Sequence, residues 1–123
     1  MQQALVIEDN ENNMELISFI LEANGFQVIQ AVTGQEGFDR ALRDKPDFIL
    51  LDIQLPDILG TEVLSMIRDS EIGTSIPIIA VTSFAMTGDE ERLLAAGCDG
   101  YIEKPIDPSL FIAQVKKVIG EEK

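Results

Sequence analysis

The chain has 123 residues, 46% of them hydrophobic, and a formal net charge of −13 at pH 7. This length fits one compact domain with its own core, and the hydrophobic content argues against a disordered tail. The acidic balance argues against a stand-alone nucleic-acid binder, which needs clustered Lys and Arg, and the lack of histidine excludes His-based catalytic triads and His-metal sites.

The chain carries no sign of a membrane or secretory route. No apolar stretch approaches the ~20 residues of a membrane helix, and Met1-Gln2-Gln3 runs directly into an apolar run without a basic signal-peptide start. Cys98 is the only cysteine, so no intrachain disulfide can form. We therefore expect a cytoplasmic protein without a membrane partner.

Short apolar runs alternate with helical patterns along the whole chain. We expect strands at 4–8, 27–31, 47–52, 77–82 and 99–103, and helices at 12–24, 35–44, 60–70, 87–96 and 108–120. Capping patterns support the helix starts at Asn12 with Glu15, Thr33 with Glu36, Thr87 with Glu90, and Asp107 with Pro108.

Five strand–helix units predict one α/β domain over residues 1–123. The expected architecture is a three-layer α/β/α sandwich, flavodoxin-like, with a parallel five-stranded sheet in the order 2-1-3-4-5. The runs at 49–51 and 78–81 are apolar throughout, as in central strands that are covered on both faces.

Polar residues follow four of the predicted strands at their C-terminal ends, where open α/β sheets bind ligands. In chain order they are Glu8 and Asp9, Asp52, Thr82 and Lys104. The predicted strand order brings these four strand ends together, so we expect the side chains to share one basin.

The composition of this basin indicates phosphoryl chemistry with a hard cation. Three carboxylates at close range repel one another, and oxygen-only ligands suit Mg²⁺, with Mn²⁺ or Ca²⁺ as substitutes. One Mg²⁺ and Lys104 would neutralise Glu8, Asp9 and Asp52. Asp52 is the candidate nucleophile, and Thr82 offers a hydroxyl donor. Taken singly, Glu8-Asp9 could be helix N-terminal charges, Thr82 a strand residue and Lys104 a surface charge, but their joint placement favours a site.

Four motifs follow one another along the chain: Val6-Ile7-Glu8-Asp9-Asn10, Leu51-Asp52-Ile53-Gln54-Leu55-Pro56 with Gly60, Ala80-Val81-Thr82-Ser83, and Tyr101-Ile102-Glu103-Lys104-Pro105. On these motifs, the chain resembles the receiver domain of two-component response regulators over essentially its whole length. Stretch 84–92 looks most like stand-alone receivers of the cell-polarity type and receivers of hybrid kinases.

The resemblance implies that Asp52 accepts phosphoryl from a phosphohistidine. It implies that Asp9, Asp52 and the backbone carbonyl of Gln54 ligate Mg²⁺, with Glu8 acting largely through water. The expected donor is a sensor histidine kinase or a histidine phosphotransfer protein. The protein is then a signalling switch and not an enzyme, since it catalyses only its own phosphorylation and dephosphorylation.

The resemblance also implies how the signal leaves the site. Thr82 and Lys104 would bind the phosphoryl group, Tyr101 would be the switch aromatic, and the Lys104–Pro105 peptide bond would be cis. The expected protein-binding face comprises the helix at 87–96, the strand at 99–103 and the helix at 108–120. We expect no DNA-binding output domain. The starting Met1 slightly favours a natural single-domain protein over an excised receiver. We expect the protein to be a monomer or a phosphorylation-dependent dimer.

Three other functions fit the sequence less well. A phosphatase of the haloacid dehalogenase type needs Asp-x-Asp after its first strand, whereas Asp52 follows the third and position 54 is Gln. A flavin carrier would want a Ser/Thr/Gly-rich phosphate loop where this chain has the acidic segment 8–13, which would repel the flavin phosphate. A degenerate receiver that never takes phosphate would not be expected to keep the complete set of site residues.

Overall fold

The computed structural model describes residues 2–70, 75–83 and 89–120, and its strands and helices alternate along the chain as predicted. The strands are β1 Gln3–Ile7, β2 Gln27–Ala31, β3 Phe48–Asp52, β4 Ile78–Thr82 and β5 Gly100–Glu103. The helices are α1 Glu11–Ala23, α2 Gly34–Asp44, α3 Gly60–Arg68, α4 Asp89–Ala96 and α5 Pro108–Ile119. In this part of the chain, no helix has both the length and the apolar character that a membrane crossing requires.

The five strands form one parallel sheet in the order β2-β1-β3-β4-β5, which confirms the predicted topology. Because every strand points the same way, all the carboxyl ends lie along one edge. At that edge Asp52 pairs in register with Val81, and Thr82 pairs with Glu103. The last residues of the central strands therefore lie close together at this edge of the sheet.

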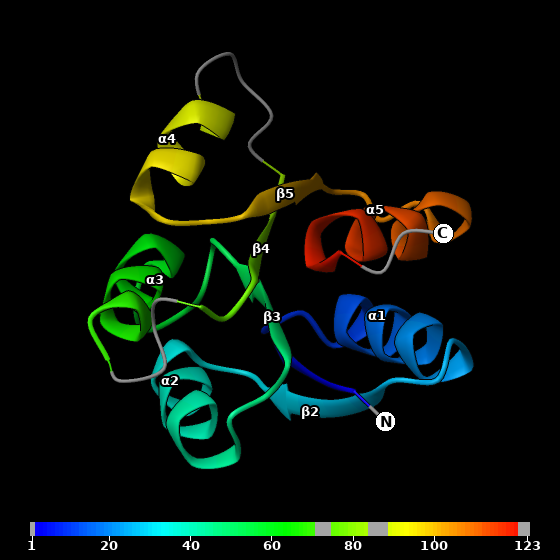
Figure 1. The fold of residues 1–123 in the computed structure, drawn as a ribbon, viewed down its shortest axis with the longest axis horizontal. Coiled ribbons are helices and arrows are strands. Elements are labelled where there is room, and N and C mark those ends of the chain that lie inside the picture. The colour runs from blue at the N-terminus through cyan, green and yellow to red at the C-terminus, as the bar shows by residue number, and fades with distance from the viewer. Residues whose placement is uncertain (1, 71–74, 84–88, 121–123) are drawn as a thin grey trace.

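Helices cover both faces of the sheet. Figure 1 shows α1 and α5 on one side and α2, α3 and α4 on the other. Alternating residues of each strand enter one of two hydrophobic clusters, one packed with α1 and α5 and the other with α2, α3 and α4. Every residue of β3 and β4 is buried, as their uninterrupted apolar runs predicted. This rigid centre holds Asp52 and Thr82, the two polar residues that end those strands.

The helix starts agree with the sequence at two places and differ at one. Thr33 caps α2 by accepting from the Glu36 amide at 3.1 Å, and Asp107 caps α5 ahead of Pro108. The prediction that Asn12 caps the first helix is wrong, because Asn10 takes that role, accepting from the Asn13 amide at 3.0 Å. Asn10 is in the extended conformation that a cap requires, so the helix begins at Glu11 and includes Asn12 in its first turn. Thr87 lies outside the described residues.

Candidate functional site

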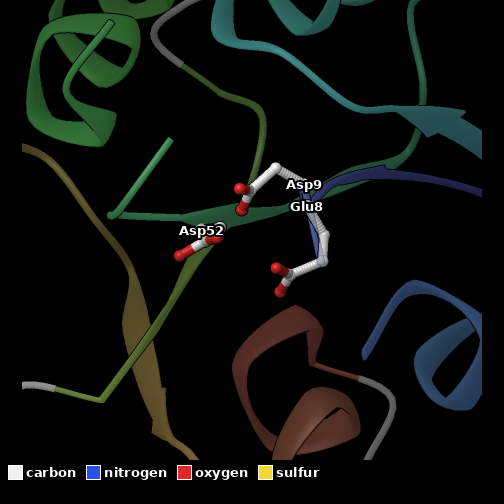
Figure 2. Close-up of side chains that lie close together, drawn as sticks. All are labelled: Glu8, Asp9 and Asp52. Carbon is white, nitrogen blue, oxygen red and sulfur yellow. The ribbon is translucent and has the colours of Figure 1, made fainter. Parts of the chain in front are cut away.

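Three carboxylates converge at the carboxyl edge of the sheet. Glu8 and Asp9 directly follow β1, and Asp52 ends the neighbouring β3. One oxygen from each lies within 4.8 Å of the other two, and Figure 2 shows the three side chains gathered in one space. Glu8 and Asp52 are 1% and 2% exposed, whereas Asp9 is exposed to solvent. The cluster thus has a buried base and an open mouth.

Lys104 supplies the positive charge of the cluster. Its Nζ lies 3.1 Å from Glu8 Oε1 and 3.4 Å from Asp52 Oδ1. The backbone holds the residue in place, since the Lys104 amide donates to the Thr82 carbonyl at 2.8 Å. The Lys104–Pro105 peptide bond is cis. One ammonium therefore faces two buried carboxylates, and negative charge remains in excess.

The surroundings raise the pKa of two of the carboxyl groups. Burial raises the pKa of Asp52 above its ordinary value of 3.8, and the adjacent Glu8 carboxylate adds to the effect. The Gln54 amide opposes this by donating to Asp52 Oδ1 at 2.9 Å. Partial desolvation and the nearby Asp52 likewise raise the pKa of Asp9. Both shifts reflect carboxylates that are crowded and short of positive charge.

This donor set fits a hard divalent cation. Glu8 Oε2 accepts from the Asn10 amide at 3.1 Å, but among the described residues no donor is aligned for a hydrogen bond with the buried Glu8 Oε1. Lys104 approaches that oxygen closely enough for an ion pair only. This one ammonium is shared between the buried carboxylates of Glu8 and Asp52, and buried carboxylates are costly unless enough positive charge balances them. Carboxylate oxygens without His or Cys match the preference of Mg²⁺.

Thr82 and Gln54 border the carboxylate cluster, Thr82 at the end of β4 and Gln54 in the segment that follows β3. Thr82 ends β4 beside Asp52 and is 1% exposed. Gln54 lies two residues beyond Asp52 with an exposed side chain, and its Oε1 accepts from the Ser83 hydroxyl at 2.8 Å. The segments that follow β3 and β4 are thereby joined across the mouth of the cluster.

Tyr101 lies apart from these residues. It sits on β5 opposite Ala80, two positions before the strand ends, and its half-buried side chain packs against the cluster of α2, α3 and α4. It also lines a surface groove of about 490 Å³ between α4 and α5, with Leu94 and Val118. The structure therefore gathers Glu8, Asp9, Asp52, Thr82 and Lys104, and places Tyr101 on a neighbouring face.

Comparison with known proteins agrees with this geometry. The model of the response regulator receiver domain matches residues 4–116. The chain belongs to the response regulator receiver family. The polar-differentiation response regulator DivK of Brucella ovis is 45% identical over 120 residues, which cover 98% of each chain. The family membership and the parallel α/β fold both confirm what the sequence motifs predicted.

Solved structures show the same fold. The receiver domain of the sensor histidine kinase PA1611 from Pseudomonas aeruginosa has a TM-score of 0.88 and 34% identity, over 97% of this chain and 98% of that one. That structure has a magnesium ion coordinated in its active-site cleft. The chemotaxis response regulator CheY4 of Vibrio cholerae has a TM-score of 0.91 at 24% identity, covering 96% of this chain and 98% of that one. The second likeness supports the fold alone.

Two contacts at the site were not predicted from the sequence. One is the Ser83 hydroxyl that holds the Gln54 side chain. The other is Asp57, whose carboxylate accepts from two backbone amides of α2. These partners are 22 to 29 residues apart along the chain, so no local pattern could reveal them.

Proposed function

We propose that this receiver takes a phosphoryl group from a phosphohistidine onto Asp52. A carboxylate oxygen of Asp52 bonds to phosphorus while the phosphorus–nitrogen bond to the donor imidazole breaks, and that nitrogen keeps the electron pair and takes up a proton. The observation that carries the proposal is the position of Asp52. It is buried at the centre of the sheet edge, with Lys104 Nζ at 3.4 Å and two further carboxylates within 4.8 Å.

We propose that Asp9, Asp52 and the backbone carbonyl of Gln54 hold Mg²⁺, with Glu8 acting largely through water. When bound, the ion supplies positive charge that neutralises oxygens of the transferring group. Mn²⁺ or Ca²⁺ can substitute in this scheme, because both prefer carboxylate and carbonyl oxygens. The crowding of the carboxylates supports the assignment, as does Glu8 Oε1, which accepts no hydrogen bond from the described residues.

The remaining residues bind the phosphoryl group and transmit its presence. We propose that Lys104 pairs with one phosphoryl oxygen and that the Thr82 hydroxyl donates to another. Thr82 and Tyr101 form the switch, and the output surface comprises α4, β5 and α5, where Tyr101 lines the groove. A downstream protein would recognise this surface. The proposal treats residues 1–123 as one receiver domain.

The proposed partners follow from this chemistry. The donor is a sensor histidine kinase or a histidine phosphotransfer protein, which places the reaction in the cytoplasm. The protein then works as a monomer or as a phosphorylation-dependent dimer. It is a signalling switch whose only catalysis is its own magnesium-dependent phosphorylation and dephosphorylation.

The test is labelling by a small phosphodonor. With Mg²⁺ and acetyl phosphate, intact-mass spectrometry should find one phosphoryl group on the wild type and none on Asp52→Ala. Asp47→Ala is a matched control, because it removes an exposed carboxylate at the opposite end of β3. Full labelling of Asp52→Ala would refute the assignment, and an unlabelled wild type would indicate a degenerate receiver.

A further inference from the structure

Asp57 joins the segment after β3 to the start of α2. It lies in residues 53–59, which connect Asp52 to α3. Its Oδ1 accepts from the Gly34 amide at 2.7 Å, and its Oδ2 accepts from the Gln35 amide at 3.1 Å. Thr33 accepts from the next amide of the helix. A carboxylate from a distant segment therefore completes the cap of α2.

This contact has the chemistry of an electrostatic anchor. The first amides of a helix lack intrahelical acceptors, and a negative charge at that end is favoured by the helix dipole. The Gly34 amide, followed by the Gln35 amide, holds the pKa of the Asp57 carboxyl below its ordinary value of 3.8. Asp57 is therefore ionised at neutral pH.

Packing around Gly34 shows how closely the two segments meet. A Cβ at Gly34 would lie 2.8 Å from Val63 Cγ2 and 3.1 Å from Ile58 Cβ, so only glycine allows this approach. The same segment is tied at its other end, where the Gly60 amide donates to the Ile53 carbonyl at 3.0 Å. The segment is thus fixed at both ends and, between them, by Asp57.

Gln54 lies inside this fixed segment. Its amide holds Asp52 Oδ1, and its carbonyl is the metal ligand in the function proposed above. Ile53, Leu55 and Ile58 pack against the apolar cluster, but apolar contacts have no direction and by themselves do not fix the height of the segment. The two hydrogen bonds of Asp57 do have direction, and they set the height of the segment relative to the carboxylates.

We propose that Asp57 is a positioning residue for the reaction at Asp52, which it serves by holding the segment that carries Gln54 against the start of α2. The inference rests on the proposed function, which assigns the backbone carbonyl of Gln54 as a ligand of Mg²⁺. It goes beyond that function in making magnesium affinity depend on a residue that touches neither the ion nor the phosphoryl group.

The test compares two Asp→Asn variants. Asp57→Asn keeps the size of the side chain but removes the charge and turns one acceptor into a donor that faces an amide. Asp47→Asn makes the same change in an exposed carboxylate that accepts from the Gln3 amide at 2.7 Å, at the far end of the strands. Calorimetric titration with Mg²⁺ alone should show affinity on the order of tenfold weaker for Asp57→Asn, and within about twofold of wild type for Asp47→Asn.

A second readout separates positioning from general loss of structure. Acetyl phosphate labelling of Asp57→Asn should be slow at low Mg²⁺ and approach the wild-type rate at saturating Mg²⁺. Asp57→Ser retains one short acceptor and should bind Mg²⁺ with intermediate affinity. Wild-type magnesium affinity in Asp57→Asn, or equal weakening in both Asn variants, would overturn the proposal. A wild type that binds Mg²⁺ but takes no label would instead overturn the proposed function and leave the affinity comparison intact.

Discussion

Replacing Asp52 with Asn should make the metal-free protein more stable. Without a divalent cation, three carboxylates face one ammonium, and Asp52 is the most central of the three. Asn keeps the side-chain size and retains an acceptor for the Gln54 amide, which donates to Asp52 Oδ1 at 2.9 Å. The substitution therefore removes charge with little change in packing.

The structure gives the size of the effect. With an effective dielectric near 20, the attraction between Asp52 and Lys104 at 3.4 Å is about 5 kcal/mol. Each repulsion, from Glu8 and from Asp9 at no more than 4.8 Å, is about 3.5 kcal/mol before solvent screens the exposed Asp9. The repulsions thus match or exceed the attraction, and the burial of Asp52 adds a further cost. We expect a net gain of about 1–2 kcal/mol for Asp52→Asn, or roughly 2–8 °C in melting temperature.

The gain should depend on pH. Because the pKa of Asp52 is raised above 3.8 in the folded protein, the folded state binds a proton more tightly than the unfolded chain does. The contribution of Asp52 to the free energy of unfolding therefore falls as the pH rises from about 3.8 through the raised pKa. Above that raised pKa, Asp52 is ionised in the folded protein and destabilises it to the full extent. The difference between the two proteins should be largest near pH 7 and should vanish below about pH 4.

Thermal unfolding in chelator at pH 4 and pH 7 measures this difference, with Asp47→Asn as the charge control. If relief of the overall charge of −13 were the cause, Asp47→Asn would stabilise as much as Asp52→Asn. Added Mg²⁺ should stabilise the wild type by mass action and the Asp52→Asn variant less. Equal shifts with Mg²⁺, or an Asp52→Asn variant no more stable than wild type in chelator, would refute this account of the cluster.

Two further substitutions test Lys104 and Thr82. Lys104→Met leaves Glu8 and Asp52 buried without an ammonium, so the free energy of unfolding in chelator should fall by about 3 kcal/mol, and an unchanged urea midpoint would contradict the pairing. The Thr82→Ala variant should still accept phosphoryl at Asp52. In NMR spectra, beryllofluoride should cause smaller chemical-shift changes on the Tyr101 face of this variant than on that of the wild type. If the changes in the wild type were confined to the carboxylate cluster, transmission of the signal from Thr82 to Tyr101 would be ruled out.

The fold could be predicted because its determinants are local and periodic. The apolar runs that became β3 and β4 are short and uninterrupted, and these strands are buried on both faces. The residue at which a helix starts depends on which of several neighbouring residues takes the N-cap position. Asn10, Asn12 and Asn13 are all capable caps by residue type, and the extended backbone just after β1 selects Asn10. A sequence pattern cannot decide between neighbours that differ only in backbone conformation.

The same distinction applies to the site, where some residues are placed by the sheet order and others by the conformation of loops. Residues at strand ends could be brought together from the sheet order alone, since parallel strands share one carboxyl edge. Asp57 and Ser83 could not, because each acts through a segment whose height and direction depend on loop conformation. Their contacts reach 22 to 29 residues along the chain and follow no period. The residues that gather at the sheet edge were therefore visible in the sequence, while the contacts made by the loops around them were not.

The same charge imbalance accounts for the strain of the cluster and for its proposed use. One ammonium against three carboxylates leaves two negative charges in excess, which one divalent cation neutralises. Phosphorylation would then replace the single charge of Asp52 with about two and add acceptor oxygens that reach further out. Lys104 would be drawn from Glu8 and Asp52 toward those oxygens, and the Thr82 hydroxyl could donate to one of them. In the function proposed here, the repulsion that costs stability in the metal-free protein would make the site respond to a cation and a phosphoryl group.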